Sequence, residues 1–164
     1  MLEVMAVTFD GAHTGERVLS ALRATRDDPW LSEVSLIEHD RDGRYSVKAK
    51  NPAVGERHAG KGAAIGGLTG LFVGVIGGPL GLMLWSGVGA LAGSAIGISK
   101  ESAFLPIVDE FKARLAPDAS MLVLVGETPA LDDLGVAVAD DDVSIHRQPL
   151  TSAQAKELSD AAAA

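Results

Sequence analysis

The chain has 164 residues, 22 acidic and 14 basic side chains, a formal net charge of −8 and no cysteine. This length suits one domain that carries an inserted segment, and it is enough to bury a hydrophobic core. The lack of cysteine excludes disulfides, thiolate catalysis and thiolate metal sites, but leaves the cellular compartment open. Nucleic-acid binding requires clustered Lys and Arg. Because the basic residues here are scattered among acids, we expect no nucleic-acid partner.

The residues before position 55 predict a strand, a helix and a hairpin. The first strand alternates in hydrophobicity, and it lacks the basic leading segment and the apolar length of a cleavable signal. Pro29 ends the following helix, and Trp30 is expected to anchor the core because an aromatic ring brings a large buried area. The expected elements are a strand at 2–9, a helix at 14–25, and hairpin strands at 33–39 and 44–50.

The residues after position 100 predict alternating helices and strands. Apolar residues at three- and four-residue spacing indicate an amphipathic helix at 104–115, and the run Met121–Val125 indicates a buried central strand. Thr151 and Gln154 form a capping-box signature at the start of the last helix. The remaining expected elements are a short helix at 130–134 and a strand at 143–148.

The order of these elements predicts an α+β fold. We expect a ferredoxin-like β-α-β-β-α-β sandwich in which the 104–115 helix is the second helix, followed by a C-terminal α-β-α extension. The sandwich and its extension occupy 1–54 and 101–164. Between them, residues 55–100 are expected to form an inserted glycine-rich helical hairpin.

The segment from Gly62 to Ser99 has no charged residue, and Lys61 and Lys100 flank it. Its glycines recur every four residues in two series, which on helices would form two faces, with larger apolar side chains opposite. A turn at Gly77-Gly78-Pro79 separates the series. The predicted helix-packing and self-association residues are Gly62, Gly66, Gly70, Gly74, Gly78, Gly89, Gly93 and Gly97.

Each glycine in a helix interior costs roughly 0.8–1 kcal/mol relative to alanine, so the twelve glycines of this segment would forgo about 10 kcal/mol. Close backbone approach across small-residue faces offsets such a cost, so we expect each face to contact another helix. Each arm of about 16–19 residues is near the lower limit for a membrane span. A membrane-inserted hairpin and a water-soluble oligomer core are therefore both open.

No motif predicts a reaction. Residues 55–61 fit G-x-x-x-x-G-K, but Gly62 stands where a phosphate-binding loop needs Ser or Thr. A helix that starts at Gly62 beside Lys61 could still hold an anion or a lipid phosphate. The acidic triplet at 140–142 is typical of a solvated turn. The four histidines are expected at the surface, and neither G-x-S-x-G nor H-E-x-x-H occurs. We expect a non-enzymatic protein without catalytic, cofactor or metal residues.

Several stretches together resemble the bacterial "domain of unknown function 1269" family. They are Phe9-Asp10, Asp42-Gly43, the Gly-Lys-Gly entry to the glycine series, and Val143–His146, so the resemblance extends over nearly the whole chain. Members of that family are commonly described as uncharacterised membrane proteins. The resemblance implies membrane attachment and supplies no catalytic residue.

These patterns favour a self-associating protein whose hairpin enters or lies against the inner membrane while the α+β domain stays in the cytoplasm. The expected partners are a second copy of the chain and membrane lipid. Two alternatives stay open: a soluble, cytoplasmic homo-oligomer that buries its hairpins, and a small-ligand-binding or sensory module that uses the open face of the sheet.

Overall fold

The computed structural model describes residues 1–48, 103, 105–139 and 142–163. Its strands form a five-stranded sheet in the order β3-β2-β4-β1-β5, and every neighbouring pair is antiparallel. The strands are β1 (Leu2–Asp10), β2 (Ser35–His39), β3 (Tyr45–Lys48), β4 (Ala119–Glu127) and β5 (Val143–Pro149). The helices are α1 (Thr14–Thr25), α4 (Leu105–Arg114), α5 (Thr128–Ala137) and α6 (Ser152–Ala163), with a 3₁₀ turn η1 at Pro29–Ser32.

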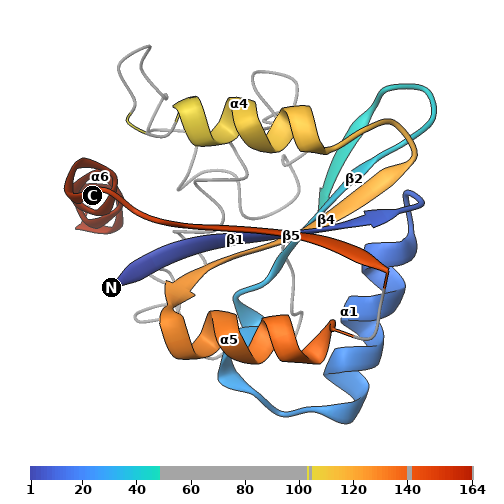
Figure 1. Cartoon of the computed structure of the whole chain (residues 1–164), viewed down its shortest axis with the longest axis horizontal. Helices are drawn as coiled ribbons and strands as arrows, with labels where there is room; N and C mark the ends of the chain where they lie inside the picture. Colours follow the sequence, from blue (N-terminus) through green and yellow to red (C-terminus); the bar gives the residue numbers. More distant parts are fainter. Residues whose placement is uncertain (49–102, 104, 140–141, 164) are drawn as a thin grey trace.

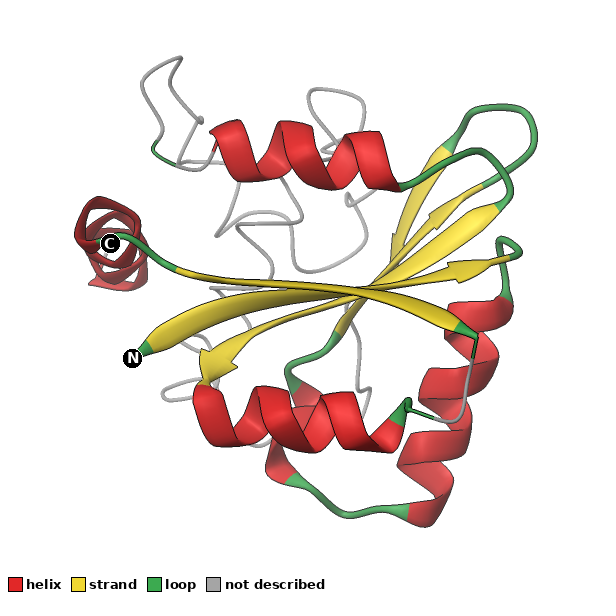
Figure 2. Cartoon of the chain, in the orientation of Figure 1, coloured by secondary structure: helices red, strands yellow, loops and turns green. Residues whose placement is uncertain are grey.

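The described elements form three layers, with α4 on one face of the sheet and α1 and α5 on the other (Figure 1). Figure 2 shows the same arrangement by secondary structure, with α6 beyond one end of the strands. Because both faces are covered, Ala119–Val125 of β4 is buried throughout. The predicted buried central strand is therefore confirmed.

Side chains of β1 alternate between two hydrophobic clusters, one on each face of the sheet. Val4 and Ala6 pack with Ile107, Phe111 and the rest of the cluster under α4. The odd-numbered residues Met5, Val7 and Phe9 face α1, η1 and α5 instead, and the expected core residue Trp30 is buried there at 5% exposure. Because successive side chains of a strand point to opposite faces, an apolar run such as 4–7 requires helices on both sides.

The sheet contains two interlocked β-α-β units. Since β1 and β2 both pair antiparallel with β4, they run parallel to each other and are joined through α1. In the same way β4 and β5 both flank β1 and are joined through α5. Both connecting helices lie on one face (Figure 1).

This topology corrects the role assigned to several predicted elements, although their order along the chain is as predicted. The helix predicted at 104–115 is α4, which lies on the opposite face from α1 and therefore does not serve as the second connecting helix. That position belongs to α5, which the sequence predicted only as a short helix in an extension. The strand β5 likewise belongs to the main sheet, paired along β1 from Glu3↔Pro149 to Phe9↔Val143.

Candidate functional site

The glycines predicted to pack helices lie outside the described residues, as do the predicted turn at Gly77, Gly78 and Pro79 and the inserted hairpin itself. These positions are Gly62, Gly66, Gly70, Gly74, Gly78, Gly89, Gly93 and Gly97. The structure does describe the chain on either side of this segment. The last described element before it is β3, which ends at Lys48 and pairs with β2, and the first described residues after it are Ala103 and those of α4.

Helix α6 binds both the N–H and the carbonyl of Ala103, the first described residue after the inserted segment. The Ala103 N–H donates to Glu157 Oε2 at 2.9 Å, and Gln154 Nε2 donates to the Ala103 carbonyl at 3.0 Å. Gln154 is buried, and it also closes the predicted capping box: the Thr151 N–H donates to Gln154 Oε1 at 2.8 Å and the Gln154 N–H to Thr151 Oγ1 at 3.2 Å. The predicted capping box is confirmed. It also orients the Gln154 side chain, which binds the backbone at Ala103, after the inserted segment.

At the opposite end of the sheet, a hydrogen-bond network fixes the loop between β1 and α1. Gly11 has φ +91°, a conformation that favours glycine, and its N–H donates to the Asp118 carbonyl at 2.8 Å. The hydroxyl of Ser120 donates to the Gly11 carbonyl at 2.9 Å and accepts from the Gly15 N–H at 2.8 Å. The start of α1 is thereby held against the first residues of β4.

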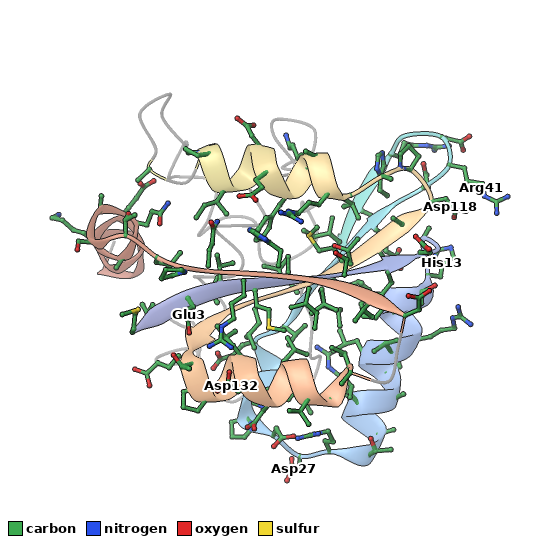
Figure 3. The ribbon with its side chains drawn as sticks, viewed as in Figure 1. Glu3, His13, Asp27, Arg41, Asp118 and Asp132 are labelled. Atoms are coloured by element: carbon green, nitrogen blue, oxygen red, sulfur yellow. The ribbon has the colours of Figure 1, made fainter. Side chains whose placement is uncertain are left out.

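Asp118 connects the same loop to the β2–β3 turn. The Ala12 N–H donates to its Oδ1 at 3.3 Å, and Arg41 Nε donates to its Oδ2 at 3.1 Å. The hydrogen bond from Arg41, followed by the one from Ala12, holds the pKa of the Asp118 carboxyl below its ordinary value. Figure 3 shows His13, Arg41 and Asp118 together at this end.

Three ligand-type side chains, which we call the His13 cluster, converge beside this network: His13, Glu16 and Glu38. Glu38 projects from β2, and its side chain is only 7% exposed, whereas that of His13 is 76% exposed. His13 Nδ1 lies 3.3 Å from Glu38 Oε1, and one ligand atom from each residue lies within 4.8 Å of the others. An imidazole and two carboxylates form a donor set that suits a divalent cation.

The sequence offered only half of the signal for this cluster. His13 and Glu16 are three residues apart at a predicted helix start, a spacing that places both side chains on one side of the helix. Glu38 is 25 residues away along the chain from His13, and only the packing of α1 on β2 brings it near. Two histidines with i, i+4 spacing would have been a recognisable motif, whereas one histidine and a distant carboxylate are not.

The prediction that every histidine lies at the surface is wrong for His39. It is 7% exposed at the end of β2, and its Nδ1 lies 2.9 Å from the Leu115 carbonyl, so the ring joins β2 to the end of α4. His146 is half-buried, with its ring edge-on to Phe111 at 5.9 Å and its Nε2 3.2 Å from Glu110 Oε1. Both rings fill space under α4, the helix whose position the sequence did not reveal.

A second ion-pair network lies at the other end of β1, where Figure 3 shows Glu3 and Asp132. Arg147 of β5 donates to both Glu3 oxygens, at 3.2 and 2.6 Å, and to Asp132 Oδ1 of α5 at 2.5 Å. Thr128 Oγ1 donates to Glu3 Oε2 at 2.7 Å. The hydrogen bonds from Arg147 and then Thr128 lower the pKa of the Glu3 carboxyl. This network joins two strands and a helix.

Together these features define an α+β domain with helices on both faces of an antiparallel sheet and polar networks at both ends of β1. A family model described as "Protein of unknown function (DUF1269)" matches residues 61–163. The chain belongs to this family, which was the resemblance predicted from the sequence. The match includes both β4 and β5, which flank β1 in the sheet.

Neither the curated proteins nor the solved structures include a significant match to the chain. In the part of the chain that the structure describes, none of the helices combines the length and the apolar composition that a membrane crossing requires. The charge-free segment from Gly62 to Ser99 is not among the residues to which this finding applies.

Proposed function

We propose that the protein is a non-enzymatic, self-associating membrane-attached protein, in which the glycine-rich segment carries both the association and the attachment. The observation that supports this proposal is the position of the segment within the domain. The described chain before it is a strand of the sheet, and α4 after it packs on the same sheet through the cluster that contains Phe111. The described residues on both sides of the segment therefore belong to one packed body.

This arrangement restricts how the segment would meet a membrane. A chain that leaves one body and returns to it crosses a bilayer an even number of times or re-enters from the same side. The turn predicted at Gly77-Gly78-Pro79 divides the segment into two arms, as a two-pass or re-entrant hairpin requires. Lys61 and Lys100 would then lie together on the side of the α+β domain, which we place in the cytoplasm at the inner membrane.

Self-association follows from the two glycine series. Without side chains between them, two helix backbones approach closely enough for extensive van der Waals contact, and this contact offsets the poor helix propensity of glycine. The second arm of the same chain can cover one face of a helix. We propose that a second copy of the chain covers the glycine face that the other arm of the hairpin leaves uncovered.

We also infer that the sheet and its connecting helices form a ferredoxin-like sandwich, to which β3 and α4 are added. The strand order β2-β4-β1-β5 with α1 and α5 on one face supports this inference. The fold alone assigns no chemistry. The sensory or small-ligand alternative uses an open face of the sheet, whereas helices lie on both faces (Figure 1), so it ranks below self-association.

Fractionation of cells that express the full chain tests the membrane attachment against the soluble alternative. We expect the protein to sediment with membranes, to stay there in 1 M salt, and to be released by mild detergent, because apolar contacts are not screened by salt. Recovery in the soluble fraction at high salt without detergent would instead support a water-soluble oligomer whose hairpins bury one another.

A further inference from the structure

We propose that β5, an edge strand of the sheet, pairs antiparallel with β5 of a second copy of the chain about a two-fold axis, so that the two sheets become one. Among the described residues β5 pairs with β1, and no strand lies on its other side. This edge is separate from the glycine-rich segment, so the pairing adds a second contact surface to the self-association proposed above.

Alternate residues of β5 direct their backbone N–H and carbonyl groups away from β1. The Leu150 N–H donates to the Leu2 carbonyl at 3.0 Å, which makes these two residues a hydrogen-bonded pair of the antiparallel ladder. Counting back along β5 from this pair, the residues that direct their backbone groups outward are Val143, Ile145, Arg147 and Pro149. Pro149 has no N–H, so its outward position costs no hydrogen bond with β1.

The outer edge of β5 lacks the features that usually keep an edge strand from pairing. Natural edges are short, bulged or lined with exposed charges, Lys above all. β5 spans seven residues, against four in the other edge strand β3, and its register with β1 is continuous. Apart from His146, its only ionisable side chain is Arg147, which is held inward by Glu3 and Asp132. Residues 143–147 are therefore free of the usual obstacles to a partner strand.

Two exposed apolar side chains lie beside this edge. Val136 of α5 is 75% exposed and Ile145 of β5 is 44% exposed. The ion pair between Asp132 and Arg147 fixes α5 against β5. Val136 is one helical turn after Asp132, about 6 Å along the helix. Ile145 is two residues before Arg147, about 7 Å along the strand. Because α5 returns the chain from the end of β4 to the start of β5, the two displacements have the same direction, and the apolar side chains lie at the same level.

A second copy of β5 suits this edge because one register is self-complementary. When Ile145 faces Ile145 of the second copy, Val143 of each copy faces Arg147 of the other. All three of these residues have an outward N–H, so each can exchange a pair of hydrogen bonds with the residue that it faces. No like charges are opposed, and the two Ile145 side chains, with Val136 of each copy beside them, form an apolar contact across the axis.

The neighbouring registers are less favourable. A pair centred on Arg147 places two guanidinium groups opposite each other. A pair centred on His146 uses Pro149, which has no N–H to donate. A pair centred on Ser144 shortens the ladder, because β5 begins only one residue earlier. We therefore assign the axis to Ile145.

The contact is small, so we expect it to form between copies that are already close. One strand pair with two apolar side chains from each copy is at the low end of interface sizes, which is typical of transient contacts. A first contact between two chains raises the effective concentration for a second one. In this respect the pairing rests on the association proposed for the glycine-rich segment.

Oxidative cross-linking of single cysteines tests the pairing, because the chain has no cysteine of its own. A residue on the axis has its Cα about 5.5 Å from its counterpart, which suits a disulfide, whereas the residues next to it lie about 7–8 Å from theirs. In full-length protein in mild detergent, oxidised with copper phenanthroline, Ile145→Cys should form a disulfide-linked dimer at least about fivefold faster than Ser144→Cys or His146→Cys. Ser144 is the matched control, since it is also exposed on β5.

The position of the cross-link and the mass of the assembly can fail separately. The pairing is overturned if Ile145→Cys forms the disulfide-linked dimer no faster than Ser144→Cys. If the unmodified protein then still has a multiple of the single-chain mass, the association through the glycine faces stands. Preferential cross-linking at Ile145 in a protein whose mass Gly93→Leu leaves unchanged would support the β5 pairing and contradict the glycine faces.

Discussion

At the scale of single residues, the contact between α1 and the sheet depends on the absence of a side chain at Gly15. A Cβ at this position would lie 2.9 Å from Leu36 Cδ1 and 3.0 Å from Ser120 Oγ. The same residue donates its N–H to that hydroxyl, so helix and strand are joined by a hydrogen bond at this close contact. The His13 cluster depends on this contact, because it places α1 over Glu38.

We expect Gly15→Ala to lower the free energy of unfolding by about 1–3 kcal/mol, since the added methyl overpacks a buried contact. Urea unfolding followed by circular dichroism measures this change. Gly135→Ala is the matched control: it is also a helical glycine, but its Cβ would meet only Met5 Cε at 3.5 Å. That variant should be neutral or gain up to about 1 kcal/mol from helix propensity. Equal effects in both variants would contradict the close-packing account.

The sequence predicted some individual residues and not others, for a physical reason. Trp30 and the capping box of Thr151 and Gln154 were predictable, because their signals depend on hydrophobicity or on neighbours three residues away. The burial of His39 and the approach of Glu38 to His13 were not, because they depend on which helix covers which face. Local sequence patterns predict local structure, whereas a cluster of polar residues from distant elements depends on how those elements pack.

At the scale of elements, the apolar runs predicted the central strands, whereas only the structure shows which face of the sheet each helix covers. A continuous apolar run such as that in β4 implies burial on both sides, which was predicted and confirmed. The sequence did not reveal that α4 takes one face while α1 and α5 share the other, since an amphipathic pattern indicates that a helix packs on the sheet but not on which face. As a result, α5 and β5 were assigned to an extension.

Arg147 ties β5 to β1 and α5, and this connection should make stability depend on pH. The pKa of Glu3 is lowered from its ordinary value of 4.5, first by the hydrogen bond from Arg147. A lowered folded-state pKa means that the carboxylate stabilises the fold fully above the unfolded value, and that this contribution is lost as pH falls through the folded value.

We therefore expect Glu3→Gln to lower the urea midpoint at pH 7, and the difference from the unmodified chain to shrink as the pH falls through the lowered pKa of Glu3 and the carboxylate becomes protonated. Glu127→Gln serves as the control, because Glu127 is an exposed carboxylate on the adjacent strand. A difference between Glu3→Gln and the unmodified chain that stayed constant from pH 7 to pH 3 would show that the network does not act through charge.

At the scale of the whole molecule, the chain combines a polar-ended α+β domain with a charge-free, glycine-spaced segment set into its middle. The described sheet takes none of its strands from the segment, and along the chain the segment lies between β3 and α4. The His13 cluster lies on the domain, at the end where the β1–α1 loop meets the β2–β3 turn. The proposed attachment and association would thus occupy a part of the chain that is separate from this cluster.

The central claim is that the glycine faces hold copies of the chain together, and the mass of the purified full-length protein in mild detergent tests it most directly. Light scattering after size exclusion should give a multiple of the single-chain mass for the unmodified protein. Gly93→Leu should shift this mass towards one chain, and Gly70→Leu should do the same.

Ala95→Leu is the matched control, since it adds the same side chain two residues away, on the face predicted to lie opposite the glycines. Its mass should equal that of the unmodified protein, and all variants should keep the circular dichroism spectrum of the folded domain. A single-chain mass for the unmodified protein, or an unchanged multiple in Gly93→Leu, would contradict association through the glycine faces.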